Sequence, residues 1–422
     1  MSERAVGWLI VATAGVLTAW RAPMYLTEPS FWAEEGQFFF PFAWSRPWLD
    51  ALVQRPVVYL HLYCNVATLA AAKLAAGGLI ALESAPRVTA CAGLAAQLVP
   101  MAIIAFGRAP EWDGTFRRVV AAALVLLVPR TGGIWLNSVT TQSYLALAAW
   151  LLVLEPPQVR GGRATAYAAL ITVCGLTGPA AAFAAPLYVW RAWRARTAAA
   201  TSQAGIMVAC AVLQVVSFLW FFGASLPGRG EGFGVLVLAA IVWKRVFVAS
   251  TLGLAASERF RTLVGGDTLA TLVLLAGAVA VIVWLAAGLP RERRPWLPGA
   301  FVLATASLFG AIGDAPRLYA QTEANQRYFL APAALFLLLV LVGIRREARP
   351  RSLVCAALLA TALATSAPGW RAGVWWRPTW PRWADEVRRW EQDPRAALRI
   401  WPLGWTTRLV PRPVPRRPWL TP

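Results

Sequence analysis

Long apolar runs alternate with short polar or basic stretches along most of the chain. A helix that crosses a bilayer needs about 20 predominantly apolar residues, and many of these runs approach that length. The pattern predicts an all-α, polytopic membrane protein with about 11 transmembrane helices within residues 1–367. The predicted spans are 5–24, 57–80, 86–107, 118–133, 139–154, 166–190, 203–222, 268–289, 299–313, 328–344 and 351–367.

The apolar stretch 234–252 does not fit this alternation. It carries Lys244 and Arg245 in the middle of the run, and an extra span here would reverse the orientation of its neighbours. We therefore predict that 223–267 forms an external loop with an interfacial amphipathic helix.

The last part of the chain, 368–422, is rich in Trp, Arg and Pro. It is not apolar enough to span and too aromatic for a disordered segment. Because Trp prefers the headgroup layer, we predict an extracytoplasmic tail at the membrane surface. Its short helix is expected at 381–392, where acidic residues come first and basic residues later, as the helix dipole favours.

Composition supports a membrane protein, since 58% of residues are hydrophobic. The net charge of +20 suggests a nucleic-acid partner. However, the basic residues cluster in short loops at 191–196, 291–294 and 345–351, as the positive-inside rule predicts for cytoplasmic loops. We therefore predict membrane lipids and no nucleic acid as partners. Alternation then places the N-terminus inside, and 25–56, 314–327 and the tail outside.

An acidic pair follows the first predicted span, in the stretch 31–38. An ionisable group at membrane depth costs about 2.5–3.5 kcal/mol, so Glu34 and Glu35 are candidates for function. A carboxylate beside a like charge in a partly desolvated site can accept a proton from an attacking hydroxyl. The alternative is a purely structural role, because 33–44 resembles an interfacial helix and acidic residues favour its first turn.

Arg327 and Tyr328 stand at the outer end of a predicted span. An arginine here can hold a lipid phosphate through two parallel N–H bonds, or it can simply extend its charged group to the interface. Arg259, Arg261 and Arg317 are weaker candidates on the same predicted side.

Other polar residues have equally ambiguous settings. Tyr59 and His61 begin a predicted span, where a lone histidine is either a substrate ligand or a satisfied hydrogen-bond donor. Asn137 and Gln142 flank a polar cluster that could hold sugar hydroxyls or cap a helix. The sequence at 177–179, Thr-Gly-Pro, breaks an apolar run and predicts either a cavity lining or a kink.

The order of these features resembles the GT-C superfamily of integral-membrane glycosyltransferases. More closely, the chain is similar to a bacterial group of uncharacterised membrane proteins with a Trp-Ala-Glu-Asp-Gly pattern, which reads Trp-Ala-Glu-Glu-Gly at 32–36 here. Each motif is short, and only the set is specific. The likeness continues through 59–62, 137–142, 176–179, 327–329 and 402–405.

The resemblance implies transfer of a sugar from a polyprenyl-phosphate donor to a glycan, lipid or protein acceptor, by a direct displacement that inverts the anomeric carbon. The reaction would occur at the outer face of the bacterial cytoplasmic membrane. Glu34 falls at the position of the family's catalytic base, but Glu replaces Asp there, which leaves open whether Glu34 or Glu35 acts. The resemblance also assigns Arg327 and Tyr328 to the donor phosphate, and it marks Trp405 as a further substrate-binding candidate.

Several points of the prediction remain open. A lone histidine and cysteines without ligand spacing give no reason to require a metal, and no cofactor is expected. The orientation of 108–138 is also open, because alternation places 134–138 inside and the resemblance favours outside. The rival functions are a flippase or exporter of lipid-linked sugars, which would carry ionisable groups in mid-span, and a non-catalytic scaffold of GT-C shape.

Overall fold

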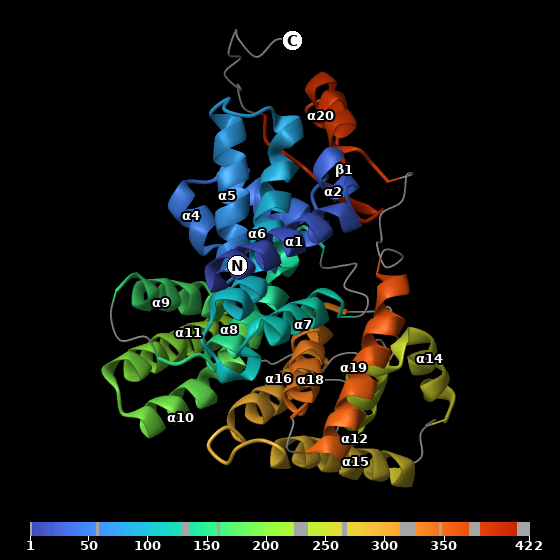
Figure 1. The fold of residues 1–422 in the computed structure, drawn as a ribbon. Helices are drawn as coiled ribbons and strands as arrows, with labels where there is room; N and C mark the ends of the chain where they lie inside the picture. Colours follow the sequence, from blue (N-terminus) through green and yellow to red (C-terminus); the bar gives the residue numbers. More distant parts are fainter. Residues whose placement is uncertain are drawn as a thin grey trace.

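The computed structural model shows an almost entirely helical chain (Figure 1). The all-α class is therefore confirmed, with one small exception described below. The structure describes residues 2–55, 59–128, 135–157, 161–222, 235–263, 268–312, 326–345, 348–370 and 380–411.

Two helices form the centre of the molecule, α8 (Gln142–Leu152) and α18 (Leu330–Val342). Every residue of both helices is buried, and the two helices pack against each other. Helices that are apolar on all sides are expected in such interior positions. Both begin directly after a short polar segment, so the first residues of the two central helices bring polar groups to the middle of the fold.

The other helices surround this pair. Helices α2, α4 and α5 lie at the end of the molecule that carries α20, whereas α12 and α15 lie at the opposite end (Figure 1). Their bounds are α1 Glu3–Arg21, α2 Met24–Thr27, α3 Phe40–Ser45, α4 Trp48–Val53, α5 Leu62–Ala76, α6 Ala85–Phe106, α7 Thr115–Leu126, α9 Gly162–Gly175, α10 Ala185–Ala195, α11 Ala198–Phe222, α12 Val235–Val242, α13 Ala249–Thr251, α14 Gly253–Leu263, α15 Thr268–Ala287, α16 Trp296–Ile312 and α19 Arg349–Gly369.

Three helical segments of the described chain are long and apolar enough to cross a membrane: Leu82–Phe106, Ala198–Trp220 and Arg349–Ala367. Shorter apolar helices of 10–17 residues occur at several other predicted spans. Large apolar side chains are exposed on α11, α15 and α19, where contact with lipid would cover them. The structure thus supports a membrane protein, but it does not establish the count of about 11 spans.

One predicted span is wrong as a continuous helix. Residues 166–190 are divided between α9, the 3-10 helix η6 (Pro179–Ala184) and α10. The break occurs at Gly178, whose φ of +88° is left-handed, and at Pro179, which has no N–H to donate. The Thr-Gly-Pro sequence at 177–179 predicts an interruption here, and the structure shows that it ends one helix and begins another.

Residues 235–252 form α12, the π-helix η7 (Trp243–Val248) and α13, which are followed by α14. Lys244 and Arg245 are buried here, and η7 packs against α18. The segment is helical, as expected. Its placement in an external loop stays a prediction.

The tail folds back onto the rest of the molecule. Its helix α20 (Trp383–Gln392) confirms the expected helix within 381–392. Beyond it lies a two-stranded antiparallel hairpin, β1 (Leu398–Ile400) and β2 (Trp405–Thr407), which the sequence analysis missed. The buried side chains of α20 and β1 pack with Phe31, Phe40 and Trp44 of the first loop. The tail and the acidic stretch therefore form one structural unit.

Candidate active site

The acidic pair lies at an unusual backbone turn. Ala33 has a φ of +35°, in the left-handed region that a residue with a side chain rarely adopts. Two residues later, Glu35 begins a π-helix, η1 (Glu35–Phe39), and such π-helical turns are frequent at functional sites. Backbone strain of this kind persists only where neighbouring structure holds it, and it clusters at active sites.

The neighbouring structure here is the tail. The Trp401 N–H donates to the Phe31 carbonyl at 3.0 Å, and the Ala33 N–H donates to the Trp401 carbonyl. These two bonds make a parallel bridge between Trp32 and Trp401. The turn before the acidic pair is thus fixed by a residue more than three hundred positions away in the chain.

Glu35 is 1% exposed, and hydrogen bonds occupy both of its carboxyl oxygens. Oε1 accepts from the Ser138 N–H at 2.8 Å and from the Ser138 hydroxyl, while Oε2 accepts from the Trp32 N–H at 3.2 Å. Burial raises the pKa of Glu35, although the hydrogen bonds from Ser138, Trp32 and Thr89 act in the opposite direction. This carboxyl group is a structural anchor between the first loop and the segment before α8.

Glu34 has a different environment. Its side chain is half-buried, and it interacts electrostatically with Arg327 and with the phenol of Tyr59. The two adjacent glutamates therefore differ in their surroundings, because hydrogen bonds enclose Glu35, whereas Glu34 is half-buried and interacts electrostatically with the Arg327 guanidinium. Of the two, Glu34 is the carboxylate that a substrate hydroxyl could reach.

Arg327 lies in the 3-10 helix η8 (Gln326–Phe329), immediately before α18. Its guanidinium carbon is 5.0 Å from the centre of the Tyr328 ring, and it also interacts electrostatically with Tyr59. Within the described chain the Arg327 Nε is buried without a hydrogen-bond partner. A guanidinium with an unused buried donor is suited to bind an oxyanion such as a phosphate.

Tyr59 connects Arg327 to two further polar segments, those that contain Gln142 and Gly178. Gln142, at the start of α8, donates from Nε2 to the Tyr59 hydroxyl at 3.1 Å. Gly178 packs against Gln142, since a Cβ at Gly178 would lie 2.3 Å from Oε1 of Gln142. The segments that contain Tyr59 and Gly178 are also joined by backbone bonds, including one of 3.1 Å from the Gly178 N–H to the Leu60 carbonyl.

His61 and Asn137 serve the fold in this structure. His61 is buried; its Nε2 donates to the Val139 carbonyl at 2.6 Å, and its Nδ1 accepts from the Cys64 N–H at 3.4 Å. Asn137 accepts at Oδ1 from the Thr140 N–H at 2.9 Å and donates to the Trp135 carbonyl at 3.2 Å. Both residues thus adopt the structural alternative that the sequence allowed: a satisfied histidine and a helix cap.

The remaining candidates are spread more widely. Trp405 is half-buried on β2, which packs against η1, so it borders the acidic stretch rather than the Arg327 group. Arg259 is exposed on α14. Arg317 and the side chain of Arg261 lie outside the described residues.

Sequence reasoning missed the structural roles of Ser138 and Trp401. Ser138 reaches Glu35 because Leu136, with a φ of +46°, turns the chain beside α6. Gly93 of α6 allows this approach, since a Cβ there would lie 2.7 Å from the Asn137 nitrogen. The two left-handed residues, Ala33 and Leu136, are not glycines, so nothing in the sequence indicates these turns.

Among the described residues, no group of three or more His, Cys, Asp or Glu side chains is placed to hold a metal ion. Taken together, the described residues form a polar site among apolar helices, with one half-buried carboxylate, one arginine and two tyrosines: Glu34, Arg327, Tyr59 and Tyr328. Comparisons of the chain with protein-family models, with curated proteins and with solved structures found no match.

Proposed function

We propose that the protein is a membrane glycosyltransferase that takes a sugar from a polyprenyl-phosphate donor. The observation that supports this best is that half-buried Glu34 interacts electrostatically with both Arg327 and Tyr59. A carboxylate that can accept a proton and a guanidinium that can hold a leaving phosphate are the two groups that this transfer needs.

In the proposed reaction, Glu34 removes the proton from an acceptor hydroxyl. The freed oxygen attacks the anomeric carbon of the donor sugar, a new C–O bond forms, and the bond to the phosphate oxygen breaks. The electron pair of that bond leaves with the polyprenyl phosphate, whose added negative charge Arg327 stabilises. Because one displacement occurs, the configuration at the anomeric carbon is inverted. Tyr59, oriented by Gln142, borders the reacting groups.

The proposal includes a bacterial cytoplasmic membrane with the site on its outer face. The first loop and the tail would then lie outside, and the basic loops inside. In this arrangement the shorter apolar helices also cross or enter the bilayer, which gives about 11 membrane helices. The acceptor is a glycan, a lipid or a protein of the envelope, and membrane lipids surround the apolar outer helices.

A profile of envelope glycans and glycolipids by mass spectrometry tests this function. The strains are a gene deletion and the same deletion carrying the wild type, Glu34→Gln or Asp50→Asn. Asp50 is an exposed acid in the same loop and serves as the matched control. We expect one sugar to disappear on deletion and to return with the wild type and Asp50→Asn only. Full recovery with Glu34→Gln would refute the assignment of the base.

A flippase or exporter of lipid-linked sugars is the second candidate, because Lys244 and Arg245 are buried within the helical core. Ionisable groups inside a membrane bundle commonly line a transport path. The same profile separates the two functions. A flippase with Glu34→Gln would keep its product, whereas Lys244→Met would remove the product and leave the lipid-linked precursor on the inner face.

A further inference from the structure

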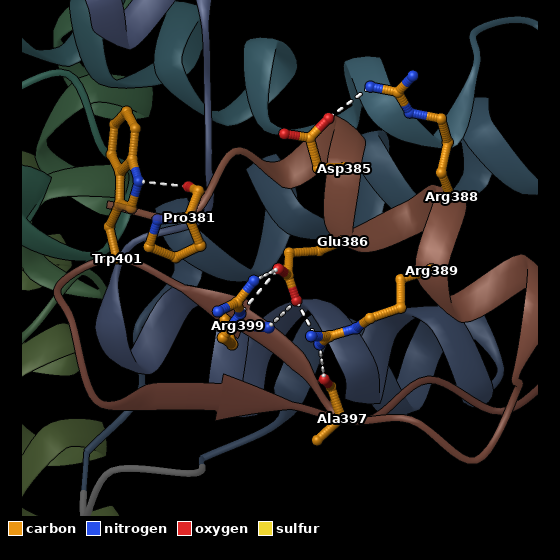
Figure 2. Close-up of polar contacts among 8 residues, drawn as sticks. All are labelled: Pro381, Asp385, Glu386, Arg388, Arg389, Ala397, Arg399 and Trp401. Carbon is orange, nitrogen blue, oxygen red and sulfur yellow. Dashed lines mark hydrogen bonds and ion pairs between the residues drawn. The ribbon is translucent and has the colours of Figure 1, made fainter. Parts of the chain in front are cut away.

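A buried carboxylate organises the tail. Glu386 of α20 is 2% exposed and binds two arginines (Figure 2). Its Oε1 accepts from the Arg399 Nε at 2.8 Å and Nη2 at 2.6 Å, and its Oε2 accepts from the Arg399 N–H at 2.9 Å and from Arg389. Arg389 in turn donates to the Ala397 carbonyl. Glu386 therefore fastens Arg399, the middle residue of β1, to α20, and Arg389 fastens Ala397, the residue before the strand.

The strand held in this way leads directly to the acidic stretch. Ile400 ends β1, and a Cβ at Gly36 would lie 2.7 Å from its Cδ1. The next residue, Trp401, makes the two backbone bonds to Phe31 and Ala33, and its indole N–H donates to the Pro381 carbonyl at 2.8 Å (Figure 2). A continuous series of contacts thus runs from Glu386 through β1 to the residue before Glu34.

The backbone conformation of Ala33 depends on this connection to the tail. An alanine in the left-handed region relaxes to a negative φ unless its surroundings prevent it. The Trp401 carbonyl, which accepts from the Ala33 N–H, supplies that restraint. If the strand moved away, Ala33 would turn and Glu34 would change direction.

We infer that Glu386 and Arg399 are positioning residues for Glu34, acting through Trp401 and the left-handed turn at Ala33. The effect of this positioning on catalysis rests on the proposed transferase function. The physical coupling between the tail and the acidic stretch does not. A misplacement of reacting groups by about 1 Å can lower a rate about a hundredfold, so loss of this restraint would be visible in turnover.

Hydrogen–deuterium exchange of the purified full-length protein tests the coupling. The variants are Glu386→Gln, which keeps the side-chain shape, and Arg399→Ala. Arg388→Ala is the matched control, because Arg388 forms an exposed ion pair with Asp385 on the same helix (Figure 2). We expect amides in 31–36 to exchange about tenfold faster in the first two variants, and at the wild-type rate in the control, with α8 unchanged in all. Equal exchange of 31–36 in Arg399→Ala and Arg388→Ala would overturn the inference.

A second readout separates positioning from general support of the fold. Glycine adopts a left-handed φ without strain, so Ala33→Gly should retain the turn without its restraint. We expect Arg399→Ala to lower formation of the envelope sugar about tenfold or more, and Ala33→Gly in the same chain to restore part of it. If exchange at 31–36 changes but Ala33→Gly restores nothing, the residues are structural and the positioning role is wrong.

The two proposals fail in different ways. If deletion of the gene alters no envelope sugar, the transferase function is wrong, while the exchange experiment still decides whether the tail restrains the acidic stretch. If deletion removes a sugar but Arg399→Ala makes it at the rate of Arg388→Ala, the positioning role is wrong and the transferase function stands.

Discussion

Glu34 and Glu35 show how neighbouring residues of one type acquire different chemistry. Consecutive helical residues point about 100° apart, so one side chain can face the interior while the next faces a site. Glu35 accepts hydrogen bonds from Ser138 and the Trp32 N–H, whereas Glu34 interacts electrostatically with Arg327. The sequence predicts a functional acidic pair. It cannot show which glutamate is structural, because Ser138, which encloses Glu35, comes from a distant segment.

The burial of Glu35 gives a prediction about stability and pH. Its pKa is raised in the folded protein, so its contribution to stability is present below the unfolded value of about 4.3 and is lost as pH rises through the folded pKa. Glu35→Gln removes this dependence. It also leaves one of the donors on Glu35 without an acceptor, at a cost of about 1–3 kcal/mol.

Thermal unfolding in detergent, measured from about pH 4 to about pH 8, checks this. We expect the wild type to be more stable than Glu35→Gln at acidic pH, and the difference to shrink as pH rises. Asp50→Asn provides the control, since its side chain is exposed. A difference that grows with pH would contradict the assignment.

At the scale of elements, the break between α9 and α10 places Gly178 against Gln142 and the segment that contains Tyr59. Gly178 needs its left-handed backbone and also the absence of a side chain, because Gln142 lies against it. Gly161 has a similar φ of +77° but open space around it. The pair of glycines therefore separates backbone strain from steric exclusion.

We expect Gly161→Ala to cost about 1–2 kcal/mol of stability from the left-handed backbone alone. Gly178→Ala should cost more, and it should also lower transfer, because the added methyl group displaces Gln142 from Tyr59. Thermal melting and the envelope-sugar assay measure the two effects. Equal losses of stability in both variants would show that the contact with Gln142 has no energetic weight.

Many of the longer helices could be predicted from the long apolar runs, and the tail helix from its charge order. The β-hairpin could not, because strands of three residues carry no clear pattern, and the groups that hold β1 and Trp401 in place, Glu386 and Phe31, come from other segments. The π-helix η1 could not be predicted either, because it follows the left-handed turn at Ala33. Local sequence thus predicts the regular elements and misses those held by distant contacts.

At the scale of the whole molecule, the candidate site is assembled from segments far apart in the chain. The first loop, the residues before α5, the start of α8 and the residues before α18 meet there. The sequence could identify each motif as a candidate. It could not predict which polar residues cap helices, because that depends on the detailed packing of His61 and Asn137.

The orientation of the molecule is a separate prediction. With the basic loops inside and the tail outside, a cysteine at Arg388 should react with a membrane-impermeant thiol reagent in intact cells, and one at Arg194 should not. Both positions are exposed in the fold, and Cys91 is replaced by Ser in the parent because it is also exposed. Labelling of Arg194→Cys before lysis, without labelling of Arg388→Cys, would show that the protein has the opposite orientation in the membrane.

The most direct test of the central claim measures transfer of labelled sugar from a polyprenyl-phosphate donor in isolated membranes of the deletion strain. The membranes carry the wild type, Glu34→Gln, Arg327→Ala or Asp50→Asn at equal protein levels. We predict wild-type rates for Asp50→Asn and a loss of about a hundredfold or more for Glu34→Gln and Arg327→Ala. Wild-type transfer by Glu34→Gln would contradict the account, because the accessible carboxylate would then not be the base.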